Sequence, residues 1–380
     1  MKKNNKNEFE TAVKNILRQS DDLEGWPEVK GFDFSEAQKK GMDNFNLTKF
    51  LDSYSSTGFQ ATNLKKAVDI IRKMNDIKKS NKAKPGNKNL KDDGITVFLG
   101  YTSNMISSGL REIIAFLVKN KMVDVIVTTA GGIEEDIIKC LKPFVIGDFN
   151  ADGSDLRQKG INRIGNIFVP NNRYIEFEKL MHPFFEKVHC ELKAEGKNSI
   201  SPQEIIYKLG KEVEINKAIS DSAKNNSILY WAAKNNIPIF CPALTDGSFG
   251  DMLYFYKKKI QKNKENKENH ENQANSEFKI DITDDIVKIN DIAINAEKTG
   301  AIILGGSLPK HHIMNANMFR DGTDYTIYIC TGSEGDGSMA GARPEEAVSW
   351  GKQGMEATSV MVEGDAAIIF PLVVAGGFLE

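Results

Sequence analysis

The sequence carries almost no excess charge of either sign. Its 380 residues include 50 Lys and Arg against 52 Asp and Glu, which gives a formal net charge of -2. A protein that binds nucleic acid or an anionic membrane over a broad surface needs an excess of basic residues. The composition therefore predicts neither partner, and any recognition of charge must be local.

Cysteine is scarce and shows no paired spacing. The four cysteines, Cys140, Cys190, Cys241 and Cys330, form no CxxC motif, and each lies in an apolar stretch typical of a buried thiol. A reducing compartment fits this pattern. The N-terminal stretch MKKNNKNEFE also lacks the apolar core of a secretory signal. We therefore expect a cytoplasmic protein.

Long hydrophobic runs are missing as well. The longest apolar run, residues 366–379, contains glycines and is shorter than the about 20 residues that cross a bilayer. We interpret it as a buried strand and its exit, and we expect no membrane association.

The chain has instead a series of short apolar segments that alternate with amphipathic helical patterns. They are residues 96–100, 123–129, 166–170, 237–244, 301–306, 324–330 and 366–374. Continuously apolar, β-branched segments of this length are typical of strands that helices cover on both faces. The pattern predicts an α/β fold with a mostly parallel sheet.

Three segments differ from this pattern. Residues 9–20 place Phe9, Val13, Ile16 and Leu17 at helical spacing, which predicts a short amphipathic helix that needs a partner surface. Residues 79–93 are polar and read as a mobile spacer. Residues 257–280 consist mostly of Lys, Asn and Glu, so we expect a disordered or solvated insertion without chemistry.

Glycine-rich polar loops follow most of the predicted strands, as in Thr129–Gly132, Thr245–Ser248, Gly305–Ser307 and Thr331–Ser333. Ligands of open α/β sheets bind beyond the carboxyl ends of strands, where glycines let the backbone approach a phosphate. The recurrence favours a nucleotide cleft over loops in which glycine merely turns the chain. No GxGxxG fingerprint occurs, so the loops alone do not specify NAD.

The segment GARPEEAVSWGK (341–352) places two carboxylates and Trp350 close to Lys352. A lysine beside an apolar wall and acidic groups can be a nucleophile toward imines. The local sequence alone favours a solvated surface lysine, and it favours a core role for Trp350.

The same segment is one of a set of motifs in a characteristic order. The others are TGFQATN (57–63), LGYTSNMISSG (99–109), TTAGGIEED (128–136), GINRIGN (160–166), ALTDGSFGDM (243–252) and GGSLPKHHIMNAN (305–317). Together they resemble the deoxyhypusine synthases over residues 30–378, apart from a spacer and an insertion. The resemblance implies a Rossmann-like, doubly wound, mostly parallel sheet with helices on both faces.

In that family NAD lies across the strand ends. The resemblance assigns cofactor contacts to Ser103, Ser107, Thr129, Ala130, Gly131, Glu135, Asp246, Gly306, Thr331, Gly332 and Asp365. Carboxylates such as Glu135 and Asp246 suit ribose hydroxyls. The alternative is that they are helix N-terminal acids that the helix dipole favours.

The family's substrate is spermidine, a flexible polycation that needs carboxylates along an apolar channel. The resemblance assigns its contacts to Asp251, Asn315, Tyr328, Asp336, Glu346 and Trp350. The Trp350 ring can also receive a cation over its face.

The resemblance further implies that His311 and Lys352 are catalytic. NAD takes a hydride from spermidine while His311 accepts a proton, and Lys352 attacks the imine and releases 1,3-diaminopropane. A lysine of the eukaryotic translation initiation factor 5A precursor then receives the 4-aminobutyl group. Adjacent His311 and His312 point in different directions, and no HExxH or Cys/His cluster occurs, so we predict no metal.

The family implies a homotetramer with active sites at subunit interfaces. We expect residues 1–30 to cap a neighbouring subunit's site and residues 31–380 to form a single catalytic domain, interrupted by the spacer and the insertion.

One departure from the family pattern leaves alternatives open. Met339 stands where the family motif has an acid that binds an amino end of the substrate. A homospermidine synthase, which uses putrescine as the acceptor, would share the imine chemistry. A non-catalytic paralogue that activates a partner subunit is the second alternative; Met339 argues for it, and Lys352 and His311 argue against it.

Overall fold

The centre of the molecule is a six-stranded parallel sheet with the order β11-β10-β9-β1-β2-β7. We describe it from a computed structural model, which covers residues 4–18, 20, 23–41, 45–82, 94–265 and 278–379. The strands are β1 (Thr96–Tyr101), β2 (Val125–Thr128), β7 (Ile239–Phe240), β9 (Thr299–Leu304), β10 (Thr323–Cys330) and β11 (Gln353–Glu363). Counted along the chain, their order is the 3-2-1-4-5-6 arrangement of a doubly wound Rossmann sheet. The predicted fold class is confirmed.

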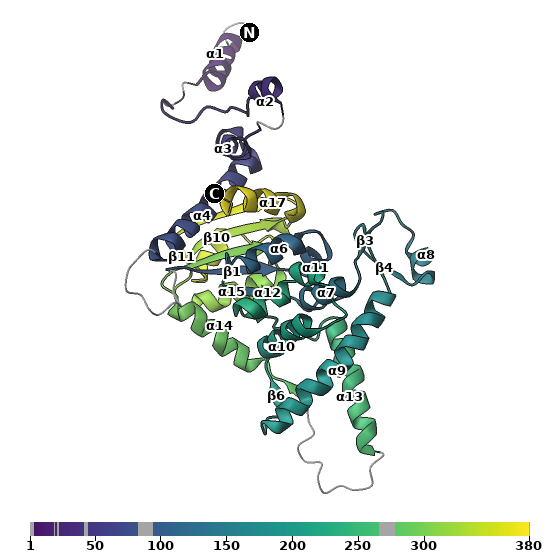
Figure 1. Cartoon of the computed structure of the whole chain (residues 1–380). Helices are drawn as coiled ribbons and strands as arrows, with labels where there is room; N and C mark the ends of the chain where they lie inside the picture. Colours follow the sequence, from purple (N-terminus) through teal and green to yellow (C-terminus); the bar gives the residue numbers. More distant parts are fainter. Residues whose placement is uncertain are drawn as a thin grey trace.

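Helices cover both faces of this sheet, as Figure 1 shows for α4 and α17 on one side and α14 and α15 on the other. Alternate residues of each strand point to opposite faces, so the sheet separates two apolar cores. The larger core joins the strands to α4 (Phe59–Lys82), α6 (Leu110–Lys119), α10 (Pro202–Ile215), α12 (Ile228–Asn235) and α17 (Ala366–Gly377). The smaller core lies under α14 (Thr283–Asn295) and α15 (Ser307–Met318).

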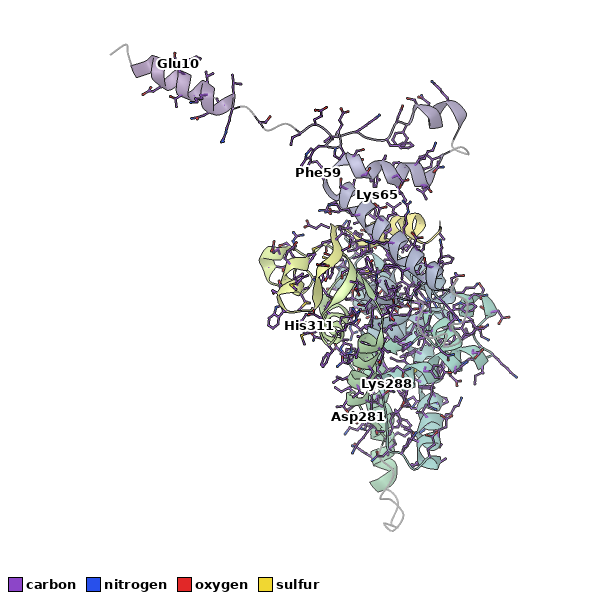
Figure 2. All side chains as sticks on the ribbon, turned by 90° about the vertical axis from the view of Figure 1, so that its left-hand side faces the viewer. Glu10, Phe59, Lys65, Asp281, Lys288 and His311 are labelled. Atoms are coloured by element: carbon purple, nitrogen blue, oxygen red, sulfur yellow. The ribbon has the colours of Figure 1, made fainter. Side chains whose placement is uncertain are left out.

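The remaining helices flank or extend this body. They are α1 (Asn4–Ile16), α2 (Ser35–Lys40), α3 (Leu47–Thr57), α5 (Asn104–Ser107), α7 (Ala130–Leu141), α8 (Gly153–Gln158), α9 (Asn172–Ala194), α11 (Asp221–Asn225), α13 (Ser248–Glu265), α16 (Pro344–Ser349) and the short 3-10 turn Glu334–Asp336. The α1 helix lies apart from the body in both views (Figures 1 and 2). Its predicted apolar stripe is uncovered, because Phe9, Ile16 and Leu17 are all exposed.

Two small sheets complete the strands. β3 (Val145–Ile146), β5 (Ile167–Pro170) and β4 (Ile161–Ile164) form an antiparallel sheet, and β6 (Ser199–Ile200) pairs with β8 (Lys279–Ile280). The segment 166–170 is therefore a strand as predicted, but it belongs to the antiparallel sheet.

The interpretation of residues 366–374 as a strand was wrong, because they form helix α17. Asp365 begins the helix by accepting a hydrogen bond from the backbone N–H of Ala367 at 2.8 Å. An unbroken apolar run fits a buried helix as well as a buried strand, and here the side-chain cap decides for the helix.

The structure also differs from the expectation of a disordered or solvated segment at residues 257–280. α13 continues to Glu265, and Lys279 and Ile280 pair with β6. Phe278 is only 2% exposed and packs against the rings of Phe185 and His189. Burial of the Phe278 ring stabilises this end of the segment, although the residues around it are mostly polar. The part between, 266–277, lies outside the described residues.

The expected spacer begins later than the sequence indicated, since residues 79–82 continue α4 and residues 83–93 lie outside the described part. Cysteine burial was also predicted incompletely. Cys140, Cys241 and Cys330 are buried, but Cys190 is exposed, because α9 turns its neighbours Val188 and His189 inward.

Within the described residues, no helix is long and apolar enough to cross a membrane.

A buried carboxylate fixes the position of α7. Asp136, which is fully buried, receives a hydrogen bond from Arg111 Nε at 2.7 Å and one from Ser227 Oγ at 2.7 Å. It also accepts the backbone N–H groups of Ile228 and Leu229 at the start of α12. One side chain thus ties α7 to α6 and to α12.

We predict that Phe278→Ala lowers the free energy of unfolding by about 3–5 kcal/mol, because it empties a buried aromatic site. Chemical denaturation of the full chain measures the change. Phe255→Ala is the matched control, since Phe255 is 46% exposed, and it should cost far less. Equal effects of the two substitutions would show that Phe278 does not anchor the segment.

Candidate active site

The predicted cofactor-binding residues all follow the carboxyl ends of the parallel strands. In the order of the sheet they are Asp365 after β11, Thr331 and Gly332 after β10, Gly306 after β9, Ser103 and Ser107 after β1, Thr129, Ala130, Gly131 and Glu135 after β2, and Asp246 after β7. The topology therefore brings the whole group to one edge of the sheet. We call this edge the carboxyl edge.

The centre of the carboxyl edge is a close contact between α5 and α7. A Cβ atom at Gly131 would lie 2.5 Å from the Cβ atom of Ser103, so only glycine permits this approach. The Ser103 backbone N–H donates to Thr129 Oγ1 at 3.0 Å. One turn further along α7, the hydroxyl of Ser107 donates to Glu135.

Burial raises the pKa of Glu135 to about 7, and the neighbouring Glu134 adds to the effect. A buried carboxyl of this kind needs hydrogen-bond donors, and ribose hydroxyls are donors. α7 begins directly after Thr129, whose side chain makes no capping hydrogen bond, and the amino end of a helix suits a phosphate. The carboxyl edge thus has the groups that a dinucleotide requires.

Asp246 and Asp251 lie at the β7 end of the same edge. Both are exposed, and both raise the pKa of Glu134, after the larger effect of burial. Glu134 itself accepts the backbone N–H of Phe249 at 2.7 Å, which holds the start of α13 against α7. Asp251, predicted to bind substrate, therefore lies with the cofactor candidates.

A second group surrounds a cavity of about 400 Å³ between α15, α16 and the start of β11. We call it the lysine pocket. Of the residues predicted by resemblance, it contains Lys352, His311, Asn315, Glu346 and Trp350. Trp350 is 64% exposed, so the alternative of a core tryptophan does not hold.

The amine of Lys352 lies 3.4 Å from His311 Nε2 and 5.2 Å from the centre of the Trp350 ring. On the other side of the imidazole, the Asn315 amide lies 3.1 Å from Nδ1. Asn315 is one helical turn after His311 on α15, so the two side chains share a face. Figure 2 marks His311 on the body of the molecule, away from α1, which carries Glu10.

Burial and the nearby Lys352 amine lower the pKa of His311 below the ordinary 6.5. The imidazole is therefore neutral at neutral pH. Base chemistry at Nε2 requires that Nδ1 carries the proton, with the oxygen of the Asn315 amide turned toward it.

Besides Asp251, two further predicted substrate residues lie outside the lysine pocket. Tyr328 is buried in β10, where its hydroxyl contacts Gln353 and its ring lies under Lys310. Asp336 is exposed, and its side chain accepts the backbone N–H of Ser338. Met339, which occupies the usual position of an acid, does line the pocket.

Sequence reasoning missed several residues of the pocket wall. Lys310 is 3% exposed and donates to the Ala342 carbonyl at 2.7 Å, and burial lowers its pKa to about 8. Met314 and Met318 follow it at the spacing of a helix face. That spacing, which runs from Lys310 in the motif GGSLPKHHIMNAN to Met318 just after it, was the signal that could have identified Met314 and Met318.

The lysine pocket and the carboxyl edge are separate groups of residues. Among the described residues that line the pocket, none is a cofactor candidate. Lys352 directly precedes β11 and pairs through its carbonyl with Thr323 at the start of β10, at the amino ends of these strands. Within the part of the chain that the structure describes, no group of three or more His, Cys, Asp or Glu side chains could hold a metal ion.

Comparisons with known proteins agree on one family. The family model for deoxyhypusine synthase matches residues 49–376. Probable deoxyhypusine synthases from Methanocaldococcus jannaschii and Schizosaccharomyces pombe are 52% and 47% identical, over 94% and 93% of this chain and 98% and 94% of their own lengths.

Among solved structures, a putative deoxyhypusine synthase from Entamoeba histolytica is similar, with a TM-score of 0.58 and 28% identity over 92% of this chain and 96% of that one. The motifs, the doubly wound sheet and these matches lead to the same result: the chain belongs to the deoxyhypusine synthase family of transferases.

Proposed function

We propose that this protein uses NAD and spermidine to transfer a 4-aminobutyl group to a lysine of the translation initiation factor 5A precursor, through an imine on Lys352. The observation that carries the proposal is the pair formed by Lys352 Nζ and His311 Nε2, 3.4 Å apart in the lysine pocket. A nucleophilic amine next to a neutral base is the arrangement that imine chemistry needs.

The residues of the pocket have distinct roles in this reaction. His311 Nε2 accepts the proton that the secondary amine of spermidine loses on oxidation. The neutral amine of Lys352 attacks the resulting imine carbon, and 1,3-diaminopropane leaves with its nitrogen reprotonated. Glu346 pairs with an ammonium group of the polyamine, and Trp350 covers its methylene chain.

The 4-aminobutyl imine on Lys352 then passes to the acceptor lysine, whose amine displaces Lys352. NAD, when bound, supplies the hydride acceptor of the first step and returns the hydride in the last. Ser103, Ser107 and Glu135 would hold it at the carboxyl edge, where the glycine contact at Gly131 and the start of α7 suit a dinucleotide.

We further propose that each active site combines the lysine pocket of one copy with the carboxyl edge of another. Within the described residues of one chain, the lysine pocket shares no lining residue with the cofactor candidates, and a hydride transfer requires contact between substrate and cofactor. In this arrangement Asp251 reaches the polyamine from the copy that holds NAD. Exposed apolar side chains on α14 and at the end of α15, among them Ile286, Val287 and the C-cap residue Phe319, provide a surface for such an assembly.

A homotetramer built on this contact is part of the proposal. The N-terminal helix α1 would cover a neighbouring site, since Phe9, Ile16 and Leu17 form an apolar stripe that its own chain leaves exposed. Residues 31–380 would act as one catalytic domain.

The central test traps the imine on Lys352. After incubation with NAD and spermidine, borohydride reduction should add one butylamine unit to the peptide that contains Lys352, measured by mass spectrometry. Lys352→Arg is the matched control, because it retains a cation but cannot form the imine, and it should remain unlabelled. Aminobutyl transfer by Lys352→Arg at the wild-type rate would disprove the role of Lys352.

The same assay separates the alternatives. Formation of homospermidine from putrescine, without transfer to the acceptor protein, would indicate a homospermidine synthase. Release of diaminopropane only in the presence of a second, different chain would favour a non-catalytic paralogue.

The low pKa of His311 predicts the pH dependence of the reaction. The base is lost only when His311 is protonated, so the acid limb of kcat/KM should lie below pH 6.5. His311→Ala should lower kcat by about 10²–10⁴-fold and remove this limb. His182→Ala is the control, since His182 lies on α9 beside Glu178. Persistence of the limb in His311→Ala would assign it to another group.

The shared site predicts complementation between two inactive variants. Lys352→Ala damages only the lysine pocket, and Asp246→Ala damages only the carboxyl edge. In a mixed pair of copies, one site is intact and the other is doubly damaged, so random mixing should restore about a quarter of wild-type activity. No recovery, despite mixed oligomers detected by native mass spectrometry, would place both groups in one chain's site.

A further inference from the structure

Lys139 makes an unusual set of contacts at the carboxyl edge. Its amine donates to the backbone carbonyls of Ile106 at 2.9 Å, Ser107 at 3.4 Å and Ser108 at 2.9 Å. These carbonyls end the very short helix α5, and a helix end leaves such groups without partners inside the helix. One ammonium group therefore closes the carboxyl end of α5.

Lys139 continues a row of contacts along one face of α7. Gly131, Glu135 and Lys139 follow one another at four-residue intervals, and residues at this spacing share a face of a helix. Each of them contacts the segment 103–108. Gly131 lies against Ser103, and Glu135 accepts a hydrogen bond from Ser107. Lys139 donates to the backbone carbonyls at the end of this segment. The row sets the distance between α5 and α7 over its whole length.

The environment of Lys139 makes these contacts strong. The side chain is half-buried, and burial lowers the pKa of its amine. The Phe144 ring lies 5.9 Å from the amine and limits its access to water. A partly desolvated ammonium depends on its carbonyl partners more than an exposed one does.

We propose that Lys139 is a positioning residue for the cofactor: by fixing the end of α5 against α7, it holds Ser103 and Ser107 where they contact NAD together with Glu135. This inference rests on the proposed function, because it concerns the cofactor of that reaction. Lys139 does not line the lysine pocket, so it acts on cofactor affinity and leaves the chemistry at Lys352 unchanged.

The test replaces Lys139 by methionine, which has a similar length and no donor, in the full chain. The loss of a charged hydrogen-bonding group should raise the Kd and KM for NAD by about 10- to 100-fold. At saturating NAD, kcat and the yield of trapped Lys352 imine should remain near wild type. Titration calorimetry measures the Kd, and steady-state kinetics separate KM from kcat.

Two further variants distinguish positioning from general stability. Lys139→Arg keeps a charge and several donors and should recover most of the NAD affinity. Lys142→Met is the matched control, because Lys142 follows the end of α7, its side chain is 43% exposed, and it pairs with Glu176 at 3.5 Å. It should bind NAD like wild type.

A folded Lys139→Met variant with wild-type NAD affinity would overturn the inference and leave the proposed function intact. A loss of kcat at unchanged KM would also overturn it. Should Lys139→Met fail to fold, Lys139→Gln carries the test, because its shorter, neutral side chain has only two donors for the three carbonyls and should bind NAD more weakly than Lys139→Arg. Wild-type NAD affinity in Lys139→Gln would overturn the proposal. Absence of NAD binding by the wild-type chain would overturn the proposed function and this inference together.

Discussion

The buried carboxylate of Asp136 is the constraint on which the carboxyl edge depends. It is fully buried on α7, next to Glu135, and its partners come from α6 and from the first turn of α12. Removing one member of such a buried ion pair leaves an uncompensated charge, at a cost on the order of 3–5 kcal/mol. The network therefore fixes α7 against α6 and α12, and the contacts of the same helix with α5 form the candidate cofactor site. Stability and site geometry are connected through a single helix.

The sequence predicted most of the central sheet, because its strands are short, apolar and buried on both faces. It failed where local pattern and tertiary context disagree. The apolar run of residues 366–374 suits a buried helix as well as a buried strand. The side-chain cap at Asp365 favours the helix. β11 was missed because much of it is polar and exposed, and its pairing with β10 shifts register after Thr323. β5 was predicted as a strand, but β3 and β4 were missed, and the antiparallel pairing of β5 could not be foreseen because strand direction leaves no trace in such a short segment.

The structure brings together some of the residues that the resemblance assigned to the site and separates others. Lys352, Glu346 and Trp350 are close in sequence, and His311 and Asn315 share a helical face, so their proximity follows from local structure. The position of Asp251 at the carboxyl edge could not be predicted, because the sequence does not show whether a residue distant from both groups lies at the carboxyl edge or in the lysine pocket. Tyr328 is buried by the alternation of side chains along β10, a feature that depends on which face α15 covers. Lys310 was overlooked since its role is visible only through the Ala342 carbonyl.

Helix α13 begins at the candidate site and ends far from it. Its first turn carries Asp251 and contacts Glu134, whereas its last residue, Glu265, lies 14 residues after Asp251, about 21 Å away along the helix axis. The chain resumes at Phe278, which is anchored in the core beside β8. Glu265 is far from the site along the helix and Phe278 is anchored in the core, so a change in the length of the chain between them costs little beyond loop-closure entropy. Evolution can lengthen or shorten the chain here, and a reporter domain can be inserted here, without moving the residues that face the ligand.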